Sequence, residues 1–263
     1  MARPVVALLT DFGTHDHYAG TMKGVVLGLC PEATLVDISH DVAPHDVLGA
    51  SLELAACYRY FPAGTIFLVV VDPGVGSSRR GLAAEAGDYR FIAPDNGVLT
   101  AVFAEARPKA VVELTERQYA RPTVSRTFEG RDRFAPAAGW LAKGVRLAAL
   151  GRPLTDYQRL DIPAPDVQAA AIAGVVLRVD HFGNLITNID RRAFDRVAQE
   201  GALEIQVGGH VIGRLVSTYA DIANGEVSVL FGSSDHLEVA ANTASAAERL
   251  QLTRGAPVTV RRR

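Results

Sequence analysis

A polar cluster near the start of the chain, Asp11–His17, contains residue types that bind metals or small ligands. It holds Asp11, His15, Asp16 and His17, and Asp11 directly follows an apolar run. Aspartate and histidine are common metal ligands, so a metal site is one interpretation. However, the cluster has neither HxxxH nor CxxC spacing, and a polar loop that bonds its own backbone is the alternative. Further ligands in the metal interpretation would be Asp37, His40, Asp41, His45 and Asp46.

A second cluster, Asp72–Arg80, follows a continuous apolar run. Its glycines would let the backbone approach a ligand closely. It has neither the lysine–serine ending of a Walker loop nor GxGxxG spacing, so it matches neither common phosphate-binding loop. A ligand-binding loop and a tight turn therefore both stay open for this segment.

A third cluster, Phe128–Pro136, places Glu129 and Asp132 beside two arginines just before a helical pattern. Asp132 could cap that helix and pair with Arg131. Glu129 could face a pocket and act as a base, or it could simply pair with a nearby arginine.

Polar groups in the second half of the chain suit recognition of a nucleoside. In Asp180–Ile189, Phe182 offers a ring for stacking and Asn184 an amide for an adenine edge. The alternative is a β-turn with the asparagine in a strained conformation. Three further groups are not diagnostic alone: Tyr219, Ser233–Asp235 and Asn242–Ala247.

The first half alternates short apolar runs with longer helical patterns, which predicts a layered α/β domain. The run at 65–71 suits a central strand buried on both faces, and Asp46 is the predicted N-cap of the helix before it. Ligands of such sheets lie beyond the carboxyl ends of the strands, where Asp11, Ser39–Asp41 and Asp72–Gly74 fall. The predicted order is strand 5–9, helix 18–30, strand 34–38, helix 46–60 and strand 65–71.

The composition changes near residues 151–170, where 151–153 and 162–165 are rich in glycine or proline and predict a linker. The segments beyond alternate in hydrophobicity and predict a small antiparallel barrel or sandwich. We therefore expect a Rossmann-like α/β domain over 1–165 and a smaller antiparallel β-barrel over 166–263. The expected strands of the second domain include 174–179, 203–207, 211–216, 226–230 and 258–262.

The composition excludes several classes of protein. The chain has 263 residues, of which 48% are hydrophobic and 21% charged, as in an ordinary globular protein. Its net charge of -2 argues against nucleic-acid binding, which usually needs a strongly basic domain. Cys30 and Cys57 form neither a disulfide framework nor a zinc motif. No signal peptide or membrane-spanning run is recognised, so we expect a cytoplasmic protein.

Seven segments, taken in order, resemble one enzyme family. The chain resembles the hydrolases of S-adenosyl-L-methionine (SAM), also called SAM hydroxide adenosyltransferases, which are relatives of the adenosyl-fluoride and adenosyl-chloride synthases. The shared order of the motifs makes this resemblance far more specific than any one of them. The matching segments are Thr10–Gly13, Asp37–His40, Asp72–Gly76, Ala93–Gly97, Gly130–Asp132 with Phe134–Pro136, Phe182–Asn184 with Thr187–Ile189, and Asn242–Ala247.

The resemblance implies an α/β domain joined to a β-barrel, and a homotrimer with SAM held between the first domain of one subunit and the second domain of the next. It implies attack of water or hydroxide on the ribose C5′, which releases methionine and forms adenosine. No metal or redox cofactor is implied, and neither nucleic acid nor a membrane is an expected partner.

The resemblance also implies roles for single residues. Asp72 and Arg79 match two members of a triad around the attacking water, and Asp11 matches the aspartate that binds the ribose hydroxyls. His45 stands where the fluoride-forming relatives have a tryptophan over the ribose. The remaining matches contact methionine (Asp180 and Ser234) or adenine (Phe182, Asn184, Tyr219 and the backbone near Ala244), with Asn242 in the same C-terminal segment.

Two further positions depart from the relatives. Glu129 stands where the hydrolases have the third triad member, a histidine, so it either replaces that base, shares a proton with Asp72, or only pairs with an arginine. Asp72 stands where the halogenating relatives have a tyrosine, and its negative charge would repel a halide. The competing hypotheses are a SAM- or adenosine-binding protein without catalysis, an adenosyl halide synthase and a metal-dependent hydrolase.

Overall fold

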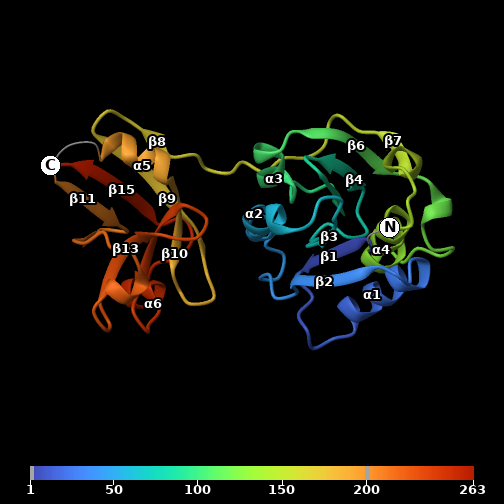
Figure 1. The fold of residues 1–263 in the computed structure, drawn as a ribbon, viewed down its shortest axis with the longest axis horizontal. Coiled ribbons are helices and arrows are strands. Elements are labelled where there is room, and N and C mark those ends of the chain that lie inside the picture. The colour runs from blue at the N-terminus through green and yellow to red at the C-terminus, as the bar shows by residue number, and fades with distance from the viewer. Residues whose placement is uncertain (1–2, 199–201) are drawn as a thin grey trace. The chain divides into compact units, whose positions relative to one another are not determined.

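The computed structural model describes residues 3–198 and 202–263. The chain divides into two compact units, Met1–Asp161 and Ile162–Arg263 (Figure 1). Residues 162–165, predicted as linker, have no regular structure. The prediction of a linker at 151–153 is wrong, because this segment is strand β7 and pairs with the neighbouring strand β6 at the edge of a sheet. Proline is tolerated there because an edge strand leaves one side unpaired.

The first unit contains a mixed seven-stranded sheet in the order β2-β1-β3-β5-β4-β6-β7. Strands β2, β1, β3 and β5 are parallel, which confirms the predicted α/β class, and β4, β6 and β7 are antiparallel. The strands are β1 (Val5–Thr10), β2 (Thr34–Ser39), β3 (Ile66–Val70), β4 (Gly81–Ala86), β5 (Tyr89–Pro94), β6 (Pro108–Leu114) and β7 (Gly151–Pro153).

Helices cover both faces of this sheet. Helices α1 (Tyr18–Leu29) and α4 (Ala135–Ala142) pack on one face, and α2 (Val47–Cys57) and α3 (Thr100–Glu105) on the other (Figure 1). Alternate residues of β3 enter the two cores, so this strand is buried on both sides as predicted. The short helical turns are η1 (Tyr58–Tyr60), η2 (Arg117–Tyr119), η3 (Gly130–Phe134, a π-helix) and η4 (Leu147–Leu150).

Helix α2 begins where the sequence predicts. The Asp46 side chain accepts a hydrogen bond of 2.9 Å from the Gly49 N–H and so caps the helix. The α-helix ends at Cys57 and continues as the tighter turn η1, so the predicted end at Tyr60 includes a 3₁₀ segment.

The second unit is an antiparallel, nearly closed β-barrel, as expected. Its strands follow the order β12-β11-β15-β9-β10-β14-β13, and β8 pairs with β9. A bridge between Leu215 and Val229 draws the two ends of the sheet together. The elements are β8 (Asp166–Val167), β9 (Ala171–Val179), β10 (Leu185–Asp190), α5 (Arg191–Val197), β11 (Leu203–Val207), β12 (His210–Ile212), η5 (Tyr219–Asp221), β13 (Val227–Phe231), β14 (His236–Ala241), α6 (Ala246–Leu250) and β15 (Pro257–Arg262).

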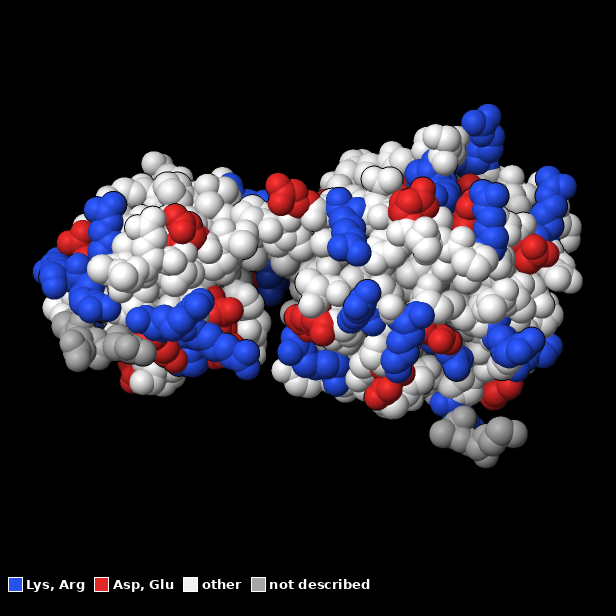
Figure 2. All heavy atoms as spheres, turned by 90° about the horizontal axis from the view of Figure 1, so that it is seen from above, with Lys and Arg blue, Asp and Glu red and all other residues white. Residues whose placement is uncertain are grey.

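Acidic and basic side chains are interspersed on the face shown in Figure 2. Within residues 3–198 and 202–263, no helix is both long and apolar enough to cross a bilayer.

The aromatic core of the first unit should contribute strongly to stability. Phe91 is fully buried and stacks on Phe67 with ring centroids 5.2 Å apart. We expect Phe91→Ala to lower the free energy of unfolding by about 3–5 kcal/mol in urea titrations, through lost burial and a residual cavity. The control Tyr60→Ala removes a ring that is 76% exposed, and it should change little. Equal effects of the two variants would contradict this assignment of the core.

Candidate active site

The site of the first unit lies at the carboxyl ends of β1 and β3, where the strand order of the sheet reverses. The connection from β1 to β2 passes through α1 on one face, whereas α2 leads to β3 on the opposite face. In the sheet, β1 has β2, the strand to which it connects, on one side and β3 on the other. In open α/β sheets, ligands bind beyond the carboxyl ends of the strands, where the strand order reverses in this way. Asp11 follows β1 and Asp72 closely follows β3, so the topology explains why both carboxylates reach one place.

Three residues predicted to be catalytic meet in this crevice. Arg79 Nε donates a hydrogen bond of 2.8 Å to Asp72 Oδ1, and Nη2 donates to Asp72 Oδ2. The same Nη2 lies 2.6 Å from Glu129 Oε2. These side chains are only 5% (Asp72), 10% (Arg79) and 13% (Glu129) exposed. A buried guanidinium thus links two carboxylates that would otherwise repel each other.

The charge of Arg79 is secured by its partners. Burial alone would lower the pKa of this guanidinium, but hydrogen bonds and charge from Asp72 and Glu129 outweigh burial and raise it. The arginine therefore stays protonated and holds the Asp72 carboxylate by two parallel bonds, the geometry in which arginine orients a carboxylate best.

Glu129 has contacts of two kinds. Its Oε1 accepts a hydrogen bond of 3.1 Å from Arg133 Nη1, so the arginine pairing considered for this residue exists. Its Oε2 is buried and, among the described residues, has no aligned hydrogen bond, although it lies close to Arg79. Glu129 also lines a cavity, so the residue lies beside the space that a bound molecule would occupy.

That cavity has a volume of about 270 Å³. Carboxylates and aromatic rings line it together, an arrangement suited to a ligand with a cationic or hydroxylated part and a flat or apolar part. Tyr18 packs edge-on against Phe128 at 5.1 Å, and Phe12 does so at 6.1 Å. The polar lining residues are Asp11, His45, Asp72, Thr127 and Glu129.

A contact between the loop after β1 and the loop after β2 places Asp11 and His45 side by side. Asp11 Oδ2 accepts a hydrogen bond of 2.9 Å from the backbone N–H of His45. His45 adopts a positive φ of 67°, which is uncommon for a residue with a side chain. The sequence predicted both residues in the ribose site, and the structure brings them together at the cavity wall.

A buried histidine holds the base of this loop. His40 Nδ1 lies 2.8 Å from Thr10 Oγ1, and its Nε2 lies 3.0 Å from Asp37 Oδ1. The His40 carbonyl accepts a hydrogen bond of 2.7 Å from the Gly13 N–H. Burial would raise the pKa of Asp37, but hydrogen bonds from Lys23 and His40 outweigh burial and lower it. The side chains of Asp37 and His40 thus bond other side chains, and not the local backbone as the polar-loop interpretation had it.

Metal binding finds no structural support in the N-terminal cluster. His15 is fully exposed and contacts only Asp16, at 3.7 Å. Over residues 3–198 and 202–263, no three His, Cys, Asp or Glu side chains gather as metal ligands would.

The loop after β3 and the segment before Glu129 fit closely together. Gly76 has a φ of +78°, and a Cβ there would lie 2.4 Å from the carbonyl oxygen of Arg126. Arg126 Nη2 in turn donates a hydrogen bond of 3.0 Å to the Gly76 carbonyl. Only glycine satisfies both the backbone conformation and this close approach.

Asp132 fixes the other side of the Glu129 segment. The side chain is fully buried and accepts hydrogen bonds from Arg131 Nε at 2.7 Å and from the Ser125 N–H at 2.8 Å. The predicted pairing with Arg131 is confirmed. The predicted helix cap is wrong: α4 has Phe134 at its N-cap, and the π-helix η3 precedes it. Asp132 instead ties the incoming loop to η3.

The second unit has its own polar cluster, formed by the turn after β9. Asp180 accepts hydrogen bonds from the N–H groups of Phe182 (2.9 Å) and Asn184 (2.8 Å) and from Asn184 Nδ2 (2.9 Å). Gly183, at φ +83°, packs against Ser245, so the glycine and not Asn184 takes the unusual conformation. The Phe182 ring is 74% exposed and is free to stack.

A glutamate that the sequence reasoning missed belongs to this cluster. Tyr219 donates a hydrogen bond to Glu238 Oε1, and Glu238 is only 5% exposed. Burial raises the pKa of both groups, and the charge of Asp180 raises each further. The signal available in the sequence was a glutamate between apolar residues of a strand, Leu237 and Val239, because burial of such a residue requires a partner.

The last three predicted residues have backbone roles in the structure. Asn242 Nδ2 donates a hydrogen bond of 2.8 Å to the Ile222 carbonyl and so ties the end of β14 to the segment after η5. Ala244 bridges to Ala241. The Ser234 carbonyl pairs with His236 Nδ1 at 2.9 Å. The structure does not bring Ser234 into hydrogen-bond contact with Asp180.

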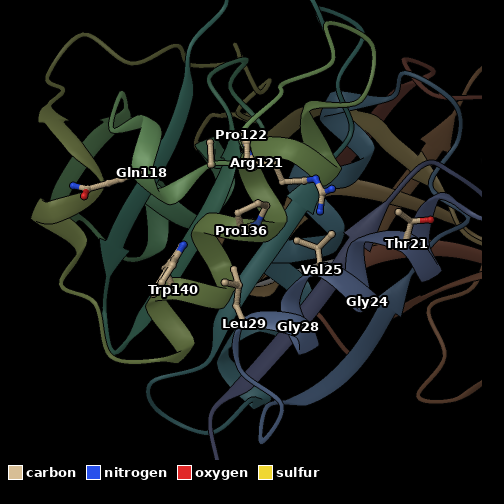
Figure 3. A pocket seen from close by; sticks show the side chains of 11 residues that line it. Thr21, Gly24, Val25, Gly28, Leu29, Gln118, Arg121, Pro122, Pro136 and Trp140 are labelled. Carbon is tan, nitrogen blue, oxygen red and sulfur yellow. The ribbon is translucent and has the colours of Figure 1, made fainter.

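A larger hollow, of about 510 Å³, lies between α1 and α4 (Figure 3). Gly24 and Gly28 of α1 and Trp140 of α4 contribute to it, and Arg121 is its only charged lining residue. None of the residues predicted from the sequence lines it, and it has no carboxylate or histidine for acid–base chemistry. The crevice at Asp11 and Asp72 is therefore the better candidate for catalysis.

Comparison with known proteins identifies the family of this chain. The chain belongs to the SAM hydroxide adenosyltransferase family, whose N-terminal and C-terminal domains match residues 6–151 and 174–259. The (R)-S-adenosyl-L-methionine hydrolase of Salinispora tropica is 37% identical over 255 residues, which cover 96% of this chain and 95% of that protein. The family predicted from the motifs is thus confirmed.

Two further comparisons concern a fluorinase and a solved structure. A fluorinase of an Actinoplanes species is 30% identical over 289 residues, covering 98% of this chain and 97% of that protein. The crystal structure of an uncharacterized conserved protein from Thermotoga maritima has a TM-score of 0.92 at 35% identity, covering 98% of this chain and 100% of that one. The relation to the halide-using enzymes expected from the motifs is confirmed as well.

The buried Asp132 should make stability depend on pH. Its pKa is lowered, chiefly by the Arg131 hydrogen bond and against the effect of burial. A lowered pKa in the folded state contributes stability above the unfolded value, about 3.9, that is lost as the pH falls further. We expect Asp132→Asn to be less stable than the wild type at pH 7, with the difference shrinking toward pH 2 in urea titrations.

The exposed Asp88, whose side chain is 78% exposed, provides the control. Asp88→Asn should match the wild type across the range. A destabilisation by Asp132→Asn that stays constant with pH would show that the carboxylate charge does not contribute.

Proposed function

We propose that this protein hydrolyses SAM to adenosine and L-methionine by attack of water on the ribose C5′. The observation that carries the proposal is the buried group of Asp72, Arg79 and Glu129 at the wall of a cavity that also holds Asp11. Membership of the family and the likeness to a curated SAM hydrolase support it.

The proposed reaction needs no general acid, but the attacking water must be positioned closely. The bond from C5′ to sulfur breaks with its electron pair going to sulfur, so methionine leaves as a neutral thioether and needs no proton. The water must be aligned with C5′ and must lose a proton as the new C–O bond forms. In the proposed mechanism Arg79 holds Asp72 in a fixed orientation, and Asp72 aligns the water.

Glu129 is the proposed acceptor of that proton. The residue borders the cavity, and its carboxylate accepts a hydrogen bond from Arg133 and lies 2.6 Å from Arg79 Nη2. Three carboxylates line this cavity, namely Asp11, Asp72 and Glu129. Their charge suits the cationic sulfonium and opposes entry of a halide, which favours water over fluoride or chloride as the nucleophile.

The remaining contacts are proposed from the family resemblance. Asp11 would bind the ribose hydroxyls, with His45 beside it. In the second unit, Asp180 and Ser234 would hold the methionine part, and the adenine would contact Phe182, Asn184, Tyr219, Asn242 and the backbone near Ala244. We further propose a cytoplasmic homotrimer in which the first unit of one subunit and the second unit of another complete each site. SAM is the substrate, and no cofactor is proposed.

The direct test is incubation of the purified protein with SAM in ¹⁸O-labelled water. We expect equal amounts of adenosine and methionine, with the label on the 5′ oxygen of adenosine. Asp72→Asn should lower kcat by about 100- to 10,000-fold with SAM binding retained, whereas the exposed Asp88→Asn should not change it. Protein that binds SAM without releasing adenosine would contradict the proposal. A product that forms only with halide would identify a halide synthase instead.

A second test addresses Glu129. Glu129→Gln keeps the shape of the side chain but cannot accept a proton, so we expect kcat to fall about 100-fold or more. Glu129→His should recover part of the activity and shift the pH–rate profile, because an imidazole titrates at a different pH. Full activity of Glu129→Gln would remove this residue from proton transfer and leave it as a partner of the arginines.

A further inference from the structure

The segment Ala93–Gly97 matches the family but has no role in the mechanism above. It contains the last two residues of β5 and the turn that follows; because β5 pairs in parallel with β3, this turn lies beside the segment that leads into Asp72. Two consecutive residues in this turn, Asp95 and Asn96, contact the two ends of the loop that carries Asp72 and Arg79.

Asn96 anchors the beginning of that loop. Its Nδ2 donates a hydrogen bond of 2.9 Å to the carbonyl of Val71, the residue immediately before Asp72. Its Oδ1 accepts a hydrogen bond of 3.2 Å from the Val98 N–H. Both ends of the amide are therefore engaged, and Val71 is fully buried, so the peptide that enters Asp72 is tightly constrained.

Asp95 anchors the end of the loop. Its Oδ2 accepts a hydrogen bond of 2.8 Å from Arg80 Nε, and its N–H donates one of 2.8 Å to the Arg80 carbonyl. Arg79 Nη1 donates to the same carbonyl at 3.3 Å. The Asp95 N–H and the Arg79 guanidinium thus donate hydrogen bonds to the same oxygen, the carbonyl of Arg80.

The loop needs both anchors because Arg79 must return to the residue at which the loop starts. Inside the loop, Ser77 Oγ donates to the Gly74 carbonyl at 2.6 Å and accepts from the Arg79 N–H at 3.2 Å. These bonds shape the loop but do not fix it to the sheet. A shift of its ends would misalign the Asp72 carboxylate, and a displacement of about 1 Å at a reacting centre costs about 100-fold in rate.

We propose that Asn96 is a positioning residue for the Asp72–Arg79 pair, with Asp95 fixing the opposite end of the same loop. The catalytic consequence rests on the proposed hydrolysis of SAM. The structural claim, that Asn96 keeps Arg79 on Asp72, does not depend on which substrate the site accepts.

The chain offers a matched control for Asn96. Asn188 of β10 has the same bonding pattern: Nδ2 donates to the Pro163 carbonyl at 3.0 Å, and Oδ1 accepts from the Val175 N–H at 2.8 Å. It lies in the second unit and has no part in the mechanism. Each asparagine bridges two backbone groups, but only Asn96 bonds the loop that carries Asp72. The effect of losing such a bridge can therefore be compared between these two positions.

The experiment compares Asn96→Leu with Asn188→Leu, because leucine is close to asparagine in size and carries no charge. For Asn96→Leu we expect kcat to fall about 10- to 100-fold with KM within a few-fold of the wild type. Asn188→Leu should leave kcat unchanged although it also loses two bonds. Asn96→Asp, which keeps the acceptor toward Val98 but loses the donor to Val71, provides a second variant should leucine prevent folding.

An NMR measurement makes the outcome independent of catalysis. Exchange of the Arg79 Nε–H with solvent, assigned through Arg79→Lys, should be at least several-fold faster in the Asn96 variants and unchanged in Asn188→Leu. Unchanged exchange in both Asn96 variants would overturn the positioning role, whether or not SAM is hydrolysed. Faster exchange in a protein that releases no adenosine would refute only the proposed hydrolysis, and faster exchange with unaltered kcat would refute the catalytic consequence of the positioning.

Discussion

The contact between Arg79 and two buried carboxylates is the constraint on which the rest of the first unit depends. Asp72 and Glu129 lie far apart in the sequence, and each would repel the other in a poorly solvated crevice. The guanidinium between them makes their approach possible, and breaking one partner of such a buried pair is costly. The surrounding loops and strands bring Asp72, Arg79 and Glu129 together and hold them in contact.

Several features of the fold support that contact. The loop after β3 carries Asp72 and Arg79, and Gly76 lets it lie against the segment before Glu129. Asp132 ties that segment to the π-helix η3. The loop after β1 supplies Asp11. Because parallel strands deliver their carboxyl ends to one edge of the sheet, residues from remote parts of the chain share one small cavity.

The barrel meets a different physical demand. A cationic substrate is served by carboxylates, yet a buried carboxylate is unstable unless it is hydrogen-bonded or protonated. Asp180 is satisfied by the N–H groups of its own turn, and Glu238 by the Tyr219 hydroxyl. Both acids of the barrel thus accept hydrogen bonds from neutral donors, and the charge of Arg178 also acts on Glu238, whereas Asp72 and Glu129 of the first unit share one arginine.

By itself, the sequence determined what depends on local pattern: the alternation of strands and helices, the cap at Asp46, and the polar residues that follow β1 and β3. The order of its motifs also determined the family. Only the tertiary structure decided which partners these residues take. Gly151–Pro153 forms an edge strand because β6 has a free edge. Asp132 accepts a hydrogen bond from the Ser125 N–H and does not cap α4. Glu238 accepts a hydrogen bond from Tyr219. Hydrophobic periodicity encodes which face of an element is buried, but contacts across the fold depend on how those elements pack.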